Sequence, residues 1–206
     1  MDIFDRDHVK SKKRDAIVKM AGQLFCAKGY GSVSIDEIAG RLGVAKTVIY
    51  YQFDNKADLF KACHISSTEL LENSLTESED KDSLKWITSF IRSYVPTLIG
   101  EQGPGAVLLD LDMLPDVEAL EISARRDVVY EKIRSLIDDA GRMSGVSRPD
   151  GAAAIFTKVL MGGINVLPKW YVAGSSCKWG PELIADTICD MVERWALSNA
   201  NPAEEK

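Results

Sequence analysis

The stretch AKTVIYYQFDNK, residues 45–56, gathers side chains that suit contact with a polyanion. If it is helical, Lys46, Thr47, Tyr50 and Tyr51 fall within about 140° of one another around the axis, because successive residues turn by ~100°. A lysine ammonium and tyrosine hydroxyls can bond phosphate oxygens, threonine can reach base edges, and tyrosine rings can pack on thymine methyls. The pattern predicts a helix face that lies in the major groove of DNA.

Three further polar residues accompany this face. We expect Gln52 and Lys56 to hold the neighbouring DNA backbone, with Lys56 opening the next helix. Ser34 is expected to cap an earlier helix, and contact with a phosphate is its second candidate role. A less specific interpretation stays open: lysines are solvated in most proteins, and Tyr50 and Tyr51 could pack between domains.

Side chains suited to catalysis or metal binding are sparse. The chain has two histidines, His8 and His64, and His64 stands alone in a helical segment, where a structural role is expected. The four cysteines are Cys26, Cys63, Cys177 and Cys189. No Ser/His/Asp set, phosphate-binding loop or metal-type Cys/His spacing occurs. Asp110, Asp112 and Asp116 could bind Mg²⁺, and a solvated helix entrance is the alternative. The sequence therefore predicts no enzyme, no metal and no cofactor.

The helix before this face is predicted from about Val9 to Lys28, where apolar residues recur at three- and four-residue steps and Gly29 follows. Its start carries the basic run KSKKR at residues 10–14, expected to be a solvated, flexible segment or an arm that grazes the DNA backbone.

A second, short helix is predicted by SIDE at residues 34–37. This is a capping box, in which the Ser34 hydroxyl bonds the Glu37 amide and the Glu37 side chain bonds back. The helix runs from Ile35 to about Leu42, and Gly43 can take the left-handed conformation that ends it. The third helix begins near Ala45.

Two short helices joined by a tight glycine turn suggest a helix-turn-helix, and Ala39, Gly43 and Ile49 stand at the spacing that lets them approach and seals their angle. The segments SIDEIA, LGV, YYQF and NKADLF then resemble the N-terminal domain of TetR-family transcriptional regulators, whose usual core reads T[TV]xxIAxxAGVSKGTLYYHFxSKExL. The resemblance covers residues 10–62. Thr47 stands at a usual glycine and Gln52 at the usual histidine, so the operator sequence is not carried over.

The resemblance implies an all-α fold and a division of labour along the chain. Residues 1–62 would form a three-helix, helix-turn-helix DNA-binding domain, residues 63–197 a helical effector-binding and dimerisation domain, and residues 198–206 a flexible tail. The implied partners are a palindromic double-stranded DNA operator and a small hydrophobic effector, and repression is the usual outcome. A helical small-ligand carrier or an enzyme without specific DNA binding is the alternative.

Further helices are predicted along the second part of the chain. They run over residues 55–77, from Ser83 with Pro96 near the end, from Asp116 to Met143, from Pro149 to about residue 173, and from Pro181, with GEQGPG at residues 100–105 as a loop. The last two are amphipathic and suit a homodimeric four-helix bundle, with packing inside a single chain as the alternative. A dimer would set two recognition helices about 34–36 Å apart on a two-fold operator.

Aromatic and sulfur-containing residues of this part could line a ligand pocket, with plain core as the alternative. They are Trp86, Phe90, Tyr94, Met113, Tyr130, Phe156 and Met161. The segments RRDVVYEKIRSLIDD and GGINVLPKWYVAGSSCKWGPELIADTICDMV are similar to a TetR subgroup that responds to acyl-CoA thioesters. This resemblance adds Asn165 and Trp170 as ligand residues, while Ala173 stands at a usual proline. The candidates for the CoA phosphates are Arg125, Arg126, Arg134 and Arg142, which on an exposed helix would otherwise be solvated.

Charge and hydropathy set the outer limits. The net charge is −6, yet residues 1–60 contain ten Lys and Arg against eight Asp and Glu, so the N-terminal part alone favours a polyanion. No run approaches the ~18 apolar residues of a membrane helix, and the charged start MDIFDRDHVKSKKRD lacks a signal-peptide core. A cytoplasmic protein without a membrane partner is expected.

Overall fold

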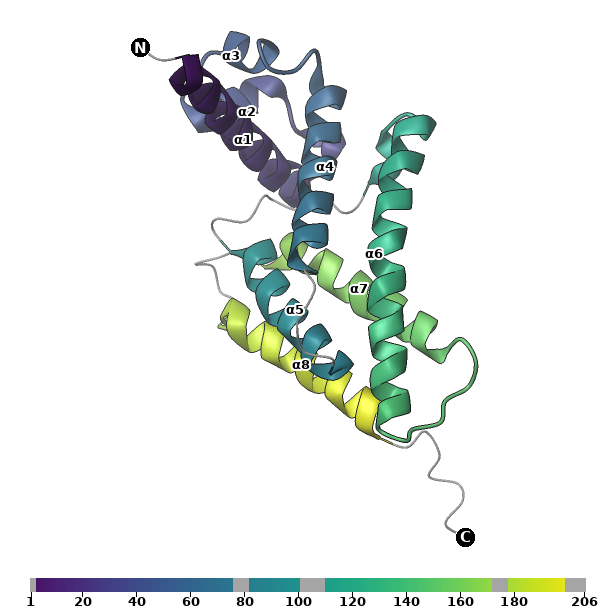
Figure 1. Cartoon of the computed structure of the whole chain (residues 1–206). Coiled ribbons are helices and arrows are strands. Elements are labelled where there is room, and N and C mark those ends of the chain that lie inside the picture. Colours follow the sequence, from purple (N-terminus) through teal and green to yellow (C-terminus); the bar gives the residue numbers. More distant parts are fainter. Residues whose placement is uncertain (1–2, 76–81, 101–109, 172–177, 199–206) are drawn as a thin grey trace.

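The computed structural model describes residues 3–75, 82–100, 110–171 and 178–198 (Figure 1). Within these ranges the chain forms eight α-helices and two short 3₁₀ turns, and no strand, which confirms the all-α prediction. The elements are α1 (Ile3–Lys28), η1 (Tyr30–Ser32), α2 (Ile35–Leu42), α3 (Lys46–Tyr50), α4 (Lys56–Ser74), α5 (Ser83–Ile99), η2 (Leu111–Met113), α6 (Asp116–Met143), α7 (Ala152–Trp170) and α8 (Pro181–Leu197). None of these helices is both long enough and apolar enough to cross a membrane.

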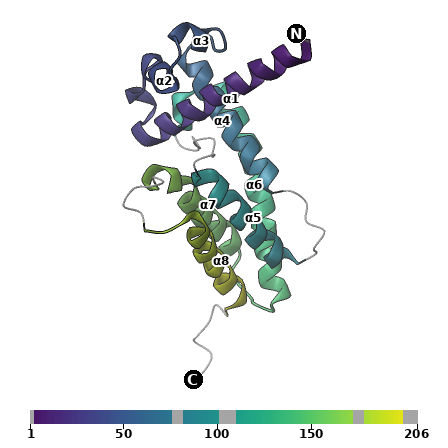
Figure 2. The same cartoon turned by 90° about the vertical axis from the view of Figure 1, so that its left-hand side faces the viewer.

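At one end of the molecule, α1, α2 and α3 surround a small apolar core (Figures 1 and 2). Phe25, Ile38 and Ile49 are buried in it, one from each of these helices. Burial of such side chains stabilises each helix by about 1.5–3 kcal/mol per residue relative to exposure. We call α1–α3 the head.

At the other end, α5, α7 and α8 pack with the lower part of α6 around a second core. The connecting helices α4 and α6 contribute to both cores: Phe60 and Ile122 lie in the head core, whereas Leu71 and Ile133 lie in the second. Both helices are therefore anchored in the two cores.

Polar contacts also join α4 to α6 along their length. Lys61 Nζ lies 3.4 Å from Glu118 Oε1, and Arg125 donates two hydrogen bonds to the Glu72 carboxylate, at 3.0 and 2.6 Å. Between these pairs, Arg126 reaches from α6 to α4. We call this row of contacts the α4–α6 seam.

Local chemistry explains most helix ends, with four corrections to the sequence predictions. Ser34 Oγ accepts from the Glu37 amide at 3.1 Å, as predicted, but the Glu37 carboxylate contacts Lys28 Nζ instead of bonding back. The N-cap of α5 is Asp82, one residue before the predicted Ser83, because a carboxylate can accept from two amides at once. The other corrections concern α7, which begins at Ala152 after Gly151 rather than at Pro149, and residues 10–14, which are helical within α1 rather than a flexible arm.

Several buried hydroxyls are satisfied within their own helices. Ser67, Thr68, Thr88 and Thr157 each donate to the carbonyl four residues earlier, at 2.8–2.9 Å. These hydroxyls therefore donate their hydrogen bonds within their own helix rather than to a neighbouring helix.

Some predictions fall outside the described residues. They concern residues 101–105 of the GEQGPG loop, Ala173 and Gly174, Cys177, and residues 199–206 of the predicted tail.

Candidate nucleic-acid interface and interior polar cluster

The third helix presents the face that its spacing predicts. Tyr50 and Tyr51 are 50% and 76% exposed, and Lys46 and Thr47 are exposed beside them, whereas Ile49 is wholly buried. Helix α3 (Lys46–Tyr50) is short, and Ile49 is its buried residue, which fixes the helix against the head core. The polar face is therefore open to a large partner while the opposite side fixes its orientation.

The turn between α2 and α3 depends on backbone geometry that favours glycine. Gly43 adopts φ 66° and ψ 30°, in the left-handed region, as predicted. Beyond it, the Val44 amide donates to the Ala39 carbonyl at 3.0 Å, and Ala39 is buried between the helices. This arrangement sets the angle between α2 and α3.

Electrostatic contacts already engage the two lysines of the predicted interface. Lys46 Nζ lies 3.5 Å from Asp36 Oδ1 on α2, and both side chains are largely exposed. The Lys56 ammonium lies 4.2 Å from the centre of the Tyr30 ring, and burial lowers the pKa of Lys56. A phosphate near Lys46 would compete with Asp36, whereas Lys56 can keep its aromatic contact and still face an anion.

Two polar residues of the predicted interface are less open than the tyrosines. Gln52 is half-buried just after α3. Ser34 is exposed, and its hydroxyl accepts from the Glu37 amide, which leaves its own proton available to a phosphate oxygen.

The residues predicted to line a pocket do not gather in one place. Phe90 and Tyr94 stack in the second core with ring centres 5.2 Å apart, and Met161 is buried in the same core. Trp86 packs at its edge, under Lys132 Nζ at 4.5 Å. Tyr130 and Asn165 belong to the interior polar cluster described below.

The other predicted pocket residues lie elsewhere. Phe156 and Trp170 line an open groove between α7 and α8, and Met113 is 53% exposed in η2, beside Leu114 of the head core. The structure therefore does not bring all nine predicted ligand residues into one site.

Arg126 is buried, at 6% exposure, where a solvated or phosphate-binding arginine was predicted. Its Nη2 lies 2.9 Å from His64 Nδ1, and its Nε donates to Thr68 Oγ1 at 3.1 Å. Burial, and then the Arg126 charge, lowers the pKa of His64 to about 3, so the ring is neutral. Because Nδ1 accepts from Arg126, the ring proton lies on Nε2.

Tyr94, Tyr130 and Asn165 continue this polar cluster toward α5 and α7. Asn165 Nδ2 donates to the Tyr130 hydroxyl at 2.7 Å. Burial raises the pKa of Tyr94, with opposing influence from the nearby Arg126 charge. His64 Nε2, the Tyr94 hydroxyl and Asn165 Oδ1 are buried and have no hydrogen-bond partner among the described residues. We call His64, Tyr94, Arg126, Tyr130 and Asn165 the interior cluster.

The remaining arginines proposed for CoA phosphates are engaged by carboxylates. Arg125 pairs with Glu72, Arg134 with Glu131 and Arg142 with Asp138. A phosphate at any of them would have to displace an acidic side chain, so the structure gives no ready phosphate site among these residues.

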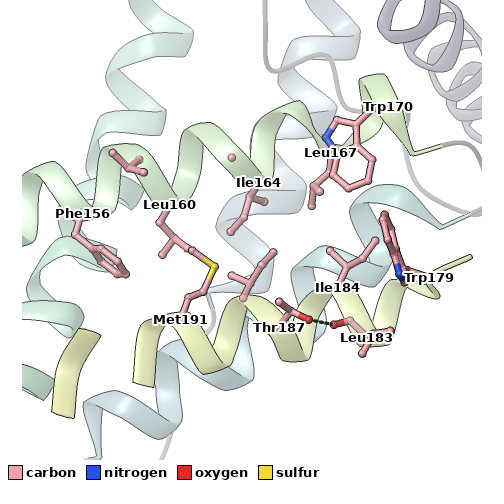
Figure 3. A pocket seen from close by; sticks show the side chains of 13 residues that line it. Phe156, Leu160, Ile164, Leu167, Trp170, Trp179, Leu183, Ile184, Thr187 and Met191 are labelled. Atoms are coloured by element: carbon pink, nitrogen blue, oxygen red, sulfur yellow. Dashed lines mark hydrogen bonds between the residues drawn. The ribbon is translucent and has the colours of Figure 1, made fainter. Parts of the chain in front are cut away.

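Figure 3 shows the groove between α7 and α8, with side chains of both helices pointing toward each other across it. Its volume is about 560 Å³. Apart from Thr187, the lining is apolar or glycine: Phe156, Val159, Leu160, Gly163, Ile164, Leu167, Trp170, Trp179, Leu183, Ile184, Ile188 and Met191. An added Cβ at Gly162 or Gly163 would meet no described atom within 4 Å, so no contact among the described residues requires glycine there.

Other reactive side chains offer no additional site. Burial raises the pKa of the Cys26 thiol to about 12 and that of Cys189 to about 11, and it raises that of Cys63 as well, so these thiols stay protonated. Across the described ranges, no group of three or more His, Cys, Asp or Glu side chains is placed to hold a metal ion, the aspartates of residues 110–116 included.

Comparison with known proteins identifies the family of this chain. A model of bacterial regulatory proteins of the tetR family matches residues 17–63. An uncharacterised helix-turn-helix transcriptional regulator of Mycobacterium tuberculosis (strain CDC 1551) is 33% identical over 187 residues, which cover 88% of this chain and 74% of that protein. The chain belongs to the TetR family of transcriptional regulators. Family membership confirms the predicted class and sets aside the enzyme alternative.

Two further similarities have narrower scope. TetC of transposon Tn10 from Escherichia coli is 38% identical over 65 residues, so the match spans only 33% of TetC. The crystal structure of AibR in complex with isovaleryl coenzyme A and operator DNA has a TM-score of 0.70 at 21% identity, over 87% of this chain and 97% of AibR. At that identity the second similarity concerns the TetR fold alone.

The sequence predictions missed the interior cluster, although a signal for it exists. Arg126 lies on the same face of α6 as Ile122, Val129 and Ile133, which is the buried face of the helix. His64 similarly follows Phe60 by one turn of α4. A polar residue at such a position is expected to be buried, and this is the signal that could have identified the cluster.

Proposed function

We propose that this TetR-family regulator is a homodimeric repressor that binds a palindromic operator through α3 and leaves it when a small hydrophobic ligand binds the second core. The observation that carries the proposal is the exposed polar face of α3, set on a buried apolar anchor. Lys46, Thr47, Tyr50 and Tyr51 would contact the major groove, and Ser34, Gln52 and Lys56 the flanking backbone.

The same proposal divides the chain. Residues 1–62 act as the DNA-binding domain and residues 63–197 as the effector-binding and dimerisation domain. The division is supported by the two apolar cores, which share only the connecting helices α4 and α6. The α4–α6 seam offers a physical route between the two parts, because ligand-induced movement of α6 pulls on the helix that begins directly after α3.

Dimerisation through α7 and α8 is supported by their apolar groove. Ile155, Val159, Leu183 and Met191 are more than half exposed on these two helices. Contiguous apolar surface of this kind marks an interaction site. Glycine inside a helix costs about 1 kcal/mol relative to alanine, and a partner helix that approaches Gly163 closely would explain its presence. A second copy of the same two helices completes a four-helix bundle.

For the effector we propose an acyl compound, with an acyl-CoA thioester as the specific candidate. The support is the similarity of residues 162–174 to the acyl-CoA-responsive subgroup, together with the isovaleryl coenzyme A bound by the structurally similar AibR. The engagement of Arg125, Arg134 and Arg142 by carboxylates means that recognition would depend on the acyl part more than on the CoA phosphates.

The proposal is tested by fluorescence anisotropy of the purified protein with labelled DNA from upstream of its own gene. Binding is measured at about 0.15 M salt against scrambled competitor, since charge-driven binding falls steeply with salt. Acyl-CoAs, isovaleryl-CoA among them, are then added. Specific binding that a thioester reverses supports the whole proposal, and specific binding that no member of the panel changes removes the acyl-CoA effector.

A further inference from the structure

The interior cluster holds three buried polar atoms whose hydrogen-bonding capacity is unused. They are His64 Nε2 from α4, the Tyr94 hydroxyl from α5 and Asn165 Oδ1 from α7. Buried polar groups in proteins nearly always have a partner, and an unused one destabilises the fold. Arg148 Nε is the other such atom in the described ranges, so three of four gather in one interior region. This concentration suggests a partner shared by the three.

Contacts with α6 bring the three atoms together. Arg126 Nη2 lies 2.9 Å from His64 Nδ1, and the Tyr130 hydroxyl lies 2.7 Å from Asn165 Nδ2. Arg126, Tyr94 and Tyr130 are close enough to act electrostatically on one another. Four helices therefore converge on one polar centre inside an otherwise apolar core.

The available atoms define the chemistry of the partner. His64 Nε2 carries the ring proton and donates, the Tyr94 hydroxyl can donate, and the Arg126 charge beside them favours electron-rich oxygen. Asn165 offers its oxygen as placed, and a half-turn of the amide would let Oδ1 accept from Tyr130 and free Nδ2 as another donor. In either orientation the centre fits a carbonyl or carboxylate oxygen.

Apolar side chains next to this centre suit a hydrocarbon chain. Phe90 stacks on Tyr94, and Met161 and Ile164 are buried on α7, the latter directly before Asn165. Methionine adapts its shape readily to apolar ligands. A ligand with one oxygen-bearing end and one apolar end matches both surroundings.

We propose that His64, Tyr94 and Asn165, grouped around Arg126, bind the carbonyl or carboxylate oxygen of an acyl ligand whose chain lies against Phe90 and Met161. The inference rests on the proposed function and names the atoms that read the effector's polar end. It also gives His64 a binding role in place of the structural one expected from the sequence. His64 lies on α4, the helix that follows α3 in the chain. The ligand therefore contacts α4 directly, rather than only through α6.

The test uses the full-length protein and three matched eight-carbon probes: octanoate, octanoyl-CoA and 1-octanol. Dissociation constants are measured by calorimetry for the wild type, Tyr94→Phe and Asn165→Leu, with Tyr30→Phe in the head as the matched control. Tyr94→Phe should weaken octanoate or octanoyl-CoA binding about tenfold, as expected for the loss of one hydrogen bond to a charged or strongly polar oxygen. 1-Octanol should bind more weakly and respond less, and Tyr30→Phe should leave all three constants unchanged.

Thermal unfolding without ligand adds a readout that a purely structural role would not give. Removing an unused buried hydroxyl should leave the melting temperature of Tyr94→Phe unchanged or raise it by a few degrees. A loss of ligand affinity together with retained stability therefore supports the proposal. A preference for octanoate over octanoyl-CoA, or the reverse, identifies which acyl compound is the source of the oxygen.

Three results would overturn it. If neither octanoate nor octanoyl-CoA binds, the cluster does not read an acyl oxygen. If they bind with equal affinity to wild type, Tyr94→Phe and Asn165→Leu, the ligand site lies elsewhere and ordered water accounts for the cluster. Equal binding of 1-octanol and octanoate contradicts recognition of a carbonyl or carboxylate. Operator binding, measured by anisotropy on the same samples, shows separately whether the proposed DNA-binding function stands.

Discussion

The head and the second core handle their polar groups in opposite ways. On α3, Lys46 and Tyr50 lie at the surface, where water and, for Lys46, the Asp36 carboxylate satisfy their polar groups. In the interior cluster, His64 and Tyr94 are wholly buried with unused hydrogen-bonding atoms. The first surface suits the large polyanion that we propose for it, whereas the second suits the small polar group of the proposed ligand. The comparison shows that the polar groups of α3 are accessible because they are exposed, whereas those of the interior cluster have unused hydrogen-bonding atoms because they are buried.

The groove of α7 and α8 provides the strongest test of how the head depends on the rest of the molecule. Gly163→Arg should prevent dimerisation, because a charged side chain would be buried against the partner's apolar face. Operator affinity should fall by at least about a hundredfold, since a monomer has only one recognition helix. Sedimentation and anisotropy measure the two effects.

Gly162→Arg is the matched control, because Gly162 is equally open but does not line the groove. If both variants stay dimeric and bind the operator normally, the dimer interface lies elsewhere.

Within the head, Tyr50→Ala should reduce specific DNA binding by about ten- to a hundredfold while leaving the fold intact, because the ring is half exposed and contributes little to the core. Circular dichroism checks the fold and anisotropy the affinity. Tyr50→Phe, which keeps the ring, should lose less. Unchanged affinity in Tyr50→Ala would mean that this face of α3 is not the reading surface.

Acid should weaken the interior more than the exposed head, through His64. Burial and the Arg126 charge lower its folded pKa to about 3, and its unfolded pKa is about 6.5. Between these pH values the unfolded chain binds a proton at His64 that the folded chain does not bind. The contribution of His64 to the free energy of unfolding is therefore fully present above about pH 6.5. It falls as the pH drops, by at most about 1.4 kcal/mol per pH unit.

Denaturant unfolding at pH 7, 6 and 5 measures this contribution as the difference between wild type and His64→Gln. Carboxylate titrations are shared by both proteins and cancel. Glutamine can still accept from Arg126, so the fold should be retained. Parallel stability curves would show that His64 is not held neutral.

The smallest effect concerns the ion pair between Asp36 and Lys46, whose atoms are 3.5 Å apart. Asp36→Asn should tighten DNA binding about two- to fivefold at 0.1 M salt, because it removes a negative charge near the phosphates and releases Lys46. The gain should shrink as salt rises. Asp150→Asn, at an exposed site far along the chain, is the control, and weaker binding by Asp36→Asn would contradict the proposed orientation of α3.

The sequence predicted the surfaces better than the interior, and the reasons are physical. The span of α6 from Asp116 to Met143 and the left-handed Gly43 follow from local periodicity and backbone preference. The exposed face of α3 follows from the same periodicity. These properties depend on residues close together in the chain.

What could not be predicted depends on contacts between distant residues. Glu37 pairs with Lys28 rather than completing its capping box, and Arg126 finds His64 across 62 positions. The sequence alone does not decide whether an arginine among the apolar positions of a helix is buried or solvated, because this depends on the residues of the helix packed against it. The separation of Phe156 and Trp170 from Phe90 likewise depends on how the helices pack, which no single helix reveals.

The buried hydroxyls described above have a consequence for how this protein could change over time. Ser67, Thr88 and Thr157 return their protons to their own helices, so much of the contact between helices in the second core is apolar and non-directional. Arg125 and Arg126 donate directional bonds from α6 to α4, and single side-chain bonds join α6 to α7 and α5 to α8. We therefore expect substitutions at Phe90 or Met161 to alter which ligand is accepted without breaking the connection to the head. Under the proposed function, such substitutions would change the ligand and leave the operator unchanged.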